Sequence, residues 1–227
     1  VVAVKPYYSD DHVTIYHGDC LELADLWTCA DVLVTDPPYG VRWESRHGDN
    51  RGPRSRRGRT PDAVDGDDSL AARDQALAAW GDRPAIVFGS WRIPRPPDVR
   101  ALLVWNKDGA YSALSRAPFF TVHEEIYVLG DGWELDDELL PLRSVLTTTE
   151  HRSQHTARVG HPTPKPLDLM RRLIERCPDG VIADPFAGSG TTLRAAKDIG
   201  RRAIGVEVKE RYCELAAKSC AQEVLAL

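Results

Sequence analysis

The tetrapeptide Asp36-Pro37-Pro38-Tyr39 combines residue types that can hold an amino group. Its two prolines stiffen the backbone and remove N–H donors, so carbonyl oxygens remain as acceptors. The Asp36 carboxylate and the Pro37 carbonyl can each accept one hydrogen of an NH2 group, which leaves the nitrogen lone pair facing an electrophile. The Tyr39 ring offers a flat surface on which a nucleobase can stack. Aspartate and proline also form ordinary turns, so this tetrapeptide gains specificity only together with other motifs.

A second candidate ligand site is the glycine-rich segment Asp184–Thr192, which follows an apolar run and precedes a helical pattern. Gly188 and Gly190 permit backbone angles and a close ligand approach that a Cβ atom would block. The N–H groups at the start of the helix can bind an anionic group, here a carboxylate. The segment differs from a phosphate-binding loop, because Pro185 replaces the first glycine and no lysine follows Gly190. It also lacks the third glycine of the dinucleotide fingerprint.

Glu207 ends the next apolar run, about fifteen residues beyond the glycine-rich turn, a position used in nucleotide-binding α/β folds. An acidic residue there can accept hydrogen bonds from the two hydroxyls of a ribose. A glutamate considered alone is more often a surface charge. Its place after the glycine-rich turn favours the ribose interpretation.

The elements that must position these residues are short strands alternating with helices. Continuous apolar runs suit strands that are buried on both faces of a mostly parallel sheet. Seven runs fit this description: residues 13–16, 31–35, 85–88, 101–105, 125–129, 180–183 and 202–206. Helical patterns occupy residues 69–80, 166–177, 191–199 and 209–227. The alternation predicts a doubly wound α/β sheet, with Asp36 and Asp184 at the same ligand-binding edge.

An arginine-rich segment lies within the polar, glycine-rich region 41–68, which is predicted to be a mobile loop. The segment runs from residue 42 to residue 59 and contains seven arginines, Glu44 and Asp49, so its net charge is +5. The total charge of the chain is −5, so the remaining residues carry −10. Such a patch can bind a phosphate backbone even on an acidic chain, although a solvated loop fits the charge equally well. The arginines are Arg42, Arg46, Arg51, Arg54, Arg56, Arg57 and Arg59.

These motifs, in this order, resemble those of the β group of S-adenosylmethionine-dependent DNA amino-methyltransferases. The resemblance covers residues 17–217. Asp36–Tyr39 is similar to the catalytic DPPY motif, and Asp184–Thr192 to the cofactor motif that comes last in this group. Four further segments match in order: His17–Cys20, Val104–Lys107, His123-Glu124 and His161–Pro166.

The resemblance implies a Rossmann-like, seven-stranded methyltransferase fold, circularly permuted, with helices on both faces of the sheet. It implies one domain over residues 1–227, with a short target-recognition insertion at about residues 131–160 in addition to the arginine-rich loop. The implied catalytic residues are Asp36, Pro37, Pro38 and Tyr39. The implied cofactor-binding residues are Asp19, Cys20, Asp36, His161, Thr163, Lys165, Asp184, Phe186, Gly188, Ser189, Gly190, Thr191 and Glu207.

The implied reaction is site-specific transfer of a methyl group from S-adenosylmethionine to a flipped-out base in duplex DNA, with the seven arginines as DNA-binding residues. Asp36, where some members have serine, favours adenine N6 over cytosine N4, although the same geometry can hold either amine. Methylation at cytosine carbon-5 needs a proline-cysteine pair, and Cys177-Pro178 has the reverse order. A catalytically inactive DNA-binding relative and a methyltransferase for RNA or protein remain alternatives.

Composition sets the remaining expectations. No apolar run approaches the roughly 18 residues of a membrane span, and the N-terminal residues do not resemble a signal peptide. We therefore expect a protein of the bacterial cytoplasm, encoded by the host or by a virus. The five cysteines form no C-x-x-C pair, and His151 and His155 lack a third ligand, so no metal is expected. A homodimer and a cognate restriction endonuclease are compatible with the family.

Overall fold

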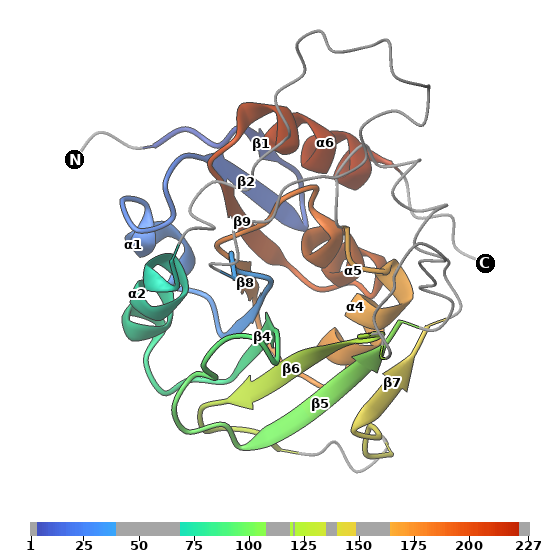
Figure 1. The fold of residues 1–227 in the computed structure, drawn as a ribbon. Helices are drawn as coiled ribbons and strands as arrows, with labels where there is room; N and C mark the ends of the chain where they lie inside the picture. Colours follow the sequence, from blue (N-terminus) through green and yellow to red (C-terminus); the bar gives the residue numbers. More distant parts are fainter. Residues whose placement is uncertain are drawn as a thin grey trace, which may run out of the picture.

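The computed structural model describes residues 4–39, 69–107, 119, 121–134, 140–148 and 164–222, and in these ranges the strands form one sheet (Figure 1). The strands are β1 Tyr8–Ser9, β2 Val13–His17, β3 Val32–Thr35, β4 Ala85–Gly89, β5 Ala101–Asn106, β6 His123–Leu129, β7 Val145–Thr147, β8 Ile182–Asp184 and β9 Ala203–Glu207. The helices are α1 Ala24–Trp27, α2 Ala71–Trp80, α4 Leu167–Ile174, α5 Thr191–Asp198 and α6 Glu210–Ala221.

The strand order is β1-β2-β9-β8-β3-β4-β6-β5-β7. All seven predicted strands form and are contiguous in this order, while β1 and β7 extend the sheet at its two edges. Adjacent strands pair in parallel, except that β1 is antiparallel to β2 and β6 is antiparallel to both β4 and β5. The prediction of a mostly parallel sheet is therefore confirmed.

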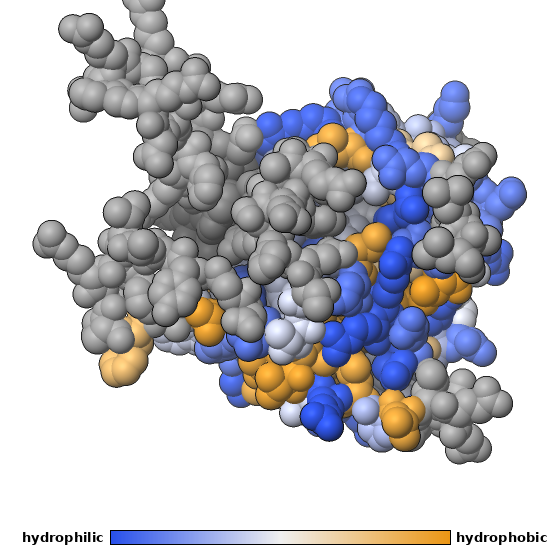
Figure 2. All heavy atoms as spheres, turned by 90° about the vertical axis from the view of Figure 1, so that its right-hand side faces the viewer, coloured by the Kyte–Doolittle hydropathy of each residue, from blue (hydrophilic) through white to orange (hydrophobic). Residues whose placement is uncertain are grey.

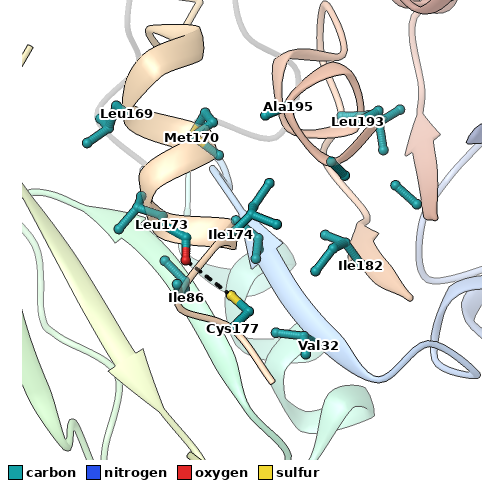
Figure 3. Close-up of a cluster of buried hydrophobic side chains, with 14 of the residues drawn as sticks. Val32, Ile86, Leu169, Met170, Leu173, Ile174, Cys177, Ile182, Leu193 and Ala195 are labelled. Carbon is teal, nitrogen blue, oxygen red and sulfur yellow. Dashed lines mark hydrogen bonds between the residues drawn. The ribbon is translucent and has the colours of Figure 1, made fainter. Parts of the chain in front are cut away.

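Helices cover both faces of the sheet, as predicted: α1 and α2 lie on one side and α4, α5 and α6 on the other (Figure 1). On the first face the indole rings of Trp27 and Trp80 are stacked, with centroids 6.1 Å apart. On the second face, α4 directs apolar side chains at the strands, and Figure 3 shows Leu173 and Ile174 in one cluster with Ile86 and Val32. Burying both faces explains why the strands read as continuous apolar runs.

Four of the five cysteines take part in this packing as small apolar residues, and Cys29 is exposed. Cys213 and Cys220 are fully buried on α6, and Cys177 donates a hydrogen bond from Sγ to the Leu173 carbonyl at 3.5 Å (Figure 3). All five cysteines are free thiols. Burial raises the pKa of the Cys177 thiol to about 12, which keeps it protonated and unreactive.

The outer surface on the side of α4 and α5 is mostly hydrophilic, with small apolar areas between the charged groups (Figure 2). This fits helices that bury one stripe of side chains and leave the opposite stripe in water. In the part of the chain that the structure describes, no helix combines the length and the apolar character that crossing a bilayer requires.

Candidate active site

A cavity of about 500 Å³ opens at the carboxyl ends of the central parallel strands. Parallel pairing of β3 with β8 brings the two predicted motifs together, because Asp36 directly follows β3 and Asp184 ends β8. The Thr35 hydroxyl donates a hydrogen bond to Asp184 Oδ1 at 2.8 Å, which ties the two strand ends to each other. This is the edge at which open α/β sheets bind ligands.

The glycine-rich turn connects β8 to α5, and its glycines have different roles. Gly188 has a φ of 52° and lines the cavity. Gly190 has a φ of 80° but does not line the cavity, and a Cβ atom there would lie 2.7 Å from the Cβ of Ala216 on α6. We therefore assign Gly190 to the close packing of α5 against α6, a role that differs from the predicted contact with a ligand.

Two acidic residues lie at the end of the cavity near β2 and β9. Parallel pairing of these strands sets His17 opposite Glu207, so Asp19 follows close beside it. Glu207 is 8% exposed, and its carboxylate accepts hydrogen bonds from the N–H groups of Gly188 and Lys209, each at 2.8 Å. Asp19 accepts one from the Leu21 N–H at 2.7 Å. Backbone donors thus orient both carboxylates, and a carboxylate can accept hydrogen bonds from a hydroxyl or an amine.

The opposite end of the cavity contains the DPPY motif within a set of paired charges. Asp36 Oδ1 accepts a hydrogen bond from the Tyr39 hydroxyl at 2.5 Å, and Asp36 Oδ2 forms an ion pair with Lys165. Lys165 Nζ is also 3.2 Å from Glu124 Oε2, and the other oxygen of Glu124 pairs with Lys107. Cations and carboxylates therefore alternate from Lys107 through Glu124 and Lys165 to Asp36.

Burial and these pairings shift the pKa values of the groups around the motif. Burial, reinforced by the Asp36 charge, raises the pKa of Tyr39 well above its usual range, so its hydroxyl remains a donor. Burial alone would raise the pKa of Glu124, but the charges of Lys165 and Lys107 outweigh it and the pKa is lowered. Burial likewise opposes the charge of Lys165, and Asp36 and Glu124 outweigh it and raise that pKa.

The Asp184 carboxyl is 2% exposed and is held by hydrogen bonds within the protein. Burial raises its pKa to about 6, against the opposing effect of hydrogen bonds from the side chains of Thr192 and Thr35. Its contacts are to neighbouring protein groups, including the Phe186 N–H at 3.2 Å. Asp184 therefore fastens the turn to the strand ends as well as lining the cavity.

Nearly all of the predicted site residues that the structure describes line this one cavity. They are Asp19, Cys20, Asp36, Pro37, Pro38, Tyr39, Lys165, Asp184, Phe186, Gly188, Ser189, Thr191 and Glu207, with Gly190 as the exception. His161, Thr163 and the seven predicted DNA-binding arginines lie outside the described residues.

Sequence reasoning gave no chemical role to four residues of the cavity wall. Glu124 and Lys107 lie in matched motif segments, but only the antiparallel pairing of β5 with β6 brings them together. Trp91, which is 54% exposed, also lines the cavity, as does the adjoining Arg92. The sequence signal for Glu124 was its place directly before the predicted apolar strand 125–129. No sequence pattern marked Trp91 as a residue of the cavity.

Comparison with known proteins identifies relatives along most of the chain. The model of the N6/N4 methyltransferase family, described as DNA methylase, matches residues 98–218. YubD of Escherichia coli (strain K12), which is named as a methylase, is 30% identical over 213 residues, covering 86% of this chain and 84% of YubD. The type II methyltransferase M.ScaI of Streptomyces caespitosus is 26% identical over 271 residues, covering 93% of this chain and 82% of M.ScaI.

Solved structures share the fold. The M1.HpyAVI–SAM complex superposes with a TM-score of 0.64 at 21% identity, covering 92% of this chain and all of the other. The PvuII DNA methyltransferase, which is cytosine-N4-specific, superposes with a TM-score of 0.67 at 16% identity, covering 98% of this chain and 91% of the other. The predicted Rossmann-like methyltransferase fold is thus confirmed.

Proposed function

The chain belongs to the family of N6/N4 DNA methylases, and on that premise we propose that it transfers a methyl group from S-adenosylmethionine to N6 of a flipped-out adenine in duplex DNA. One observation carries the proposal. A single cavity has the DPPY motif at one end and two oriented carboxylates, Asp19 and Glu207, at the other. A base whose amine receives the methyl group and a nucleoside-type cofactor can therefore bind next to each other in this cavity.

The residues of the cavity fit S-adenosylmethionine in size and in chemistry. A volume of about 500 Å³ is within the range of small-molecule sites. The carboxylates of Glu207 and Asp19 suit the ribose hydroxyls and the adenine amine, and Phe186 offers an aromatic face. Thr191, in the first turn of α5, lies where N–H groups can hold the carboxylate of the methionine end.

Bound S-adenosylmethionine supplies the methyl group as an electrophile and leaves as S-adenosylhomocysteine. The protein's part is to hold the acceptor nitrogen in line with that group. A carboxylate oxygen of Asp36 and the Pro37 carbonyl accept the two amine hydrogens, and Tyr39 stacks on the base. The nitrogen lone pair forms the new bond to carbon while the carbon–sulfur electron pair stays with sulfur. The nitrogen, now positively charged, then passes one proton along its hydrogen bond to the Asp36 carboxylate, which releases it to solvent, and a neutral methylated amine remains.

The choice of adenine rests on Asp36. An aspartate at the first position of the motif favours N6 of adenine, while serine at that position is associated with N4 of cytosine in the resemblance described above. From the same family resemblance we propose duplex DNA with a defined recognition sequence as substrate, a cytoplasmic location, a homodimer, and a cognate restriction endonuclease as partner.

Methyl transfer from labelled S-adenosylmethionine to mixed-sequence duplex DNA tests the proposal. The DNA is digested to nucleosides, and we expect the label in N6-methyladenine. Asp36→Ala should abolish it, whereas Asp82→Ala, the same change at an exposed aspartate outside the cavity, should not. Label in N4-methylcytosine would keep the mechanism and overturn the base. Cofactor binding without any label in DNA would overturn the DNA assignment.

A further inference from the structure

Lys165 lies at the end of the cavity that contains the DPPY motif, where the target base is proposed to bind. Its Nζ atom is paired with Asp36 and lies 3.2 Å from Glu124 Oε2 and 3.4 Å from the Tyr39 hydroxyl. The same ammonium lies 4.8 Å from the centre of the Phe88 ring. Every one of these contacts is to the DPPY motif or to the wall behind it. The position therefore favours a role for Lys165 at the nucleobase that receives the methyl group, over the predicted role of holding the cofactor.

The contacts of Lys165 fix the orientation of the Asp36 carboxylate. One carboxylate oxygen accepts the Tyr39 hydroxyl and the other accepts the Lys165 ammonium, so rotation about the side-chain bonds would break two hydrogen bonds. Hydrogen bonds to a charged group are roughly twice as strong as those between neutral groups, so two of them hold the carboxylate in one rotamer. The Asp36 carboxylate is thereby oriented before the target base binds.

Lys165 in turn needs Glu124. Its side chain is 8% exposed, and a buried ammonium is costly unless carboxylates compensate it. Glu124 provides the second carboxylate, and Lys107 pairs with Glu124, so this group of four described residues contains two cations and two anions. Loss of Glu124 would leave this group with one excess cation. That cation would lie beside the amine nitrogen of the target base, which becomes positive during methyl transfer.

We propose that Lys165 is a positioning residue for Asp36, and that Glu124, paired with Lys107, holds Lys165 in place. The role rests on the proposed function, since it concerns the acceptor end of the same reaction. It predicts that Lys165 acts on the rate of methyl transfer and leaves the affinity for the cofactor unchanged.

Lys165→Gln separates this role from cofactor binding. We expect kcat for DNA methylation to fall about 100-fold, as misplacement of a reacting group typically causes, with the Kd for S-adenosylmethionine unchanged by calorimetry. Retained cofactor binding also shows that the variant is folded. A control is Lys197→Gln, which removes an ion pair with Asp10 outside the cavity and should leave kcat unchanged. A Kd raised tenfold or more with kcat preserved would overturn the proposal in favour of a cofactor contact.

A double-mutant cycle tests the part played by Glu124. Glu124→Gln should lower kcat, and Glu124→Gln with Lys165→Gln should be no slower than Lys165→Gln alone, because both act through the same contact. The double variant removes one charge of each sign and so remains neutral if a single variant is unstable. Multiplying losses would show that Glu124 acts independently of Lys165 and would overturn its role.

The wild-type enzyme distinguishes the two levels of proposal. If it methylates adenine N6 in DNA, the proposed function stands whatever the variants do, and an unimpaired Lys165→Gln would overturn the positioning role alone. If it methylates cytosine N4 instead, the proposed base is wrong, and the variants still test the positioning role. If it binds cofactor but methylates no DNA, the proposed function fails, and the positioning role fails with it.

Discussion

At the scale of single residues, the Asp36 carboxylate accepts hydrogen bonds from two groups of the protein, and in the proposed mechanism it also accepts one from the target amine. Tyr39 and Lys165 each take one oxygen, and the amine must share the remaining lone pairs. An acceptor that is already oriented loses little freedom when the base enters the cavity. Preorganisation of this kind is a larger contribution to catalysis than the strength of any one hydrogen bond.

The Tyr39 hydroxyl can be tested separately from its ring. Tyr39→Phe keeps the stacking surface and removes the 2.5 Å hydrogen bond to Asp36, so we expect kcat to fall about tenfold, with the Kd for cofactor unchanged. Tyr8→Phe is a matched control, because the Tyr8 hydroxyl donates to Asp10 Oδ2 at 2.7 Å outside the cavity. Steady-state methylation of DNA measures kcat for both variants. A Tyr39→Phe enzyme with wild-type kcat would show that stacking alone accounts for Tyr39.

At the scale of elements, the sheet edge could be predicted because each motif follows a strand that is apolar throughout. The runs ending at Asp36 and Asp184 gave two parallel strands, and their carboxyl ends lie side by side as expected. The short elements β1, β7 and α1 were missed, since two to four residues are too few to show periodicity. The pairing of Lys107 with Glu124 depends on the register of β5 and β6, which no local pattern specifies.

The start of α5 offers a prediction about stability. Gly190→Ala places a Cβ on backbone with a φ of 80° and within 2.7 Å of Ala216, so we expect a loss of about 2–4 kcal/mol in the free energy of unfolding. Gly200→Ala has a similar φ of 76° and no atom within 4 Å, so its loss should be about 1–2 kcal/mol. Urea unfolding followed by tryptophan fluorescence compares the two. Equal losses would show that contact between α5 and α6 does not require glycine.

At the scale of the whole molecule, charge is distributed unevenly. The chain carries −5 overall, yet residues 42–59 carry +5, so the rest is strongly acidic. An acidic body repels a phosphate backbone, and a local cationic segment can overcome that repulsion only over a short range, because salt screens charges beyond about 10 Å. The affinity for DNA should therefore depend on this segment and fall steeply as salt is added.

Paired substitutions measure that dependence. We expect Arg56→Gln with Arg57→Gln to weaken binding of mixed-sequence duplex DNA and to reduce the slope of log K against log salt by up to about 2, which corresponds to two lost phosphate contacts. Arg100→Gln with Arg202→Gln removes the same charge from exposed positions outside the cavity and should leave the slope nearly unchanged. Fluorescence anisotropy at several salt concentrations gives both slopes. Equal effects of the two pairs would mean that DNA senses the net charge of the protein, and the assignment of the arginine-rich segment as a DNA contact would be wrong.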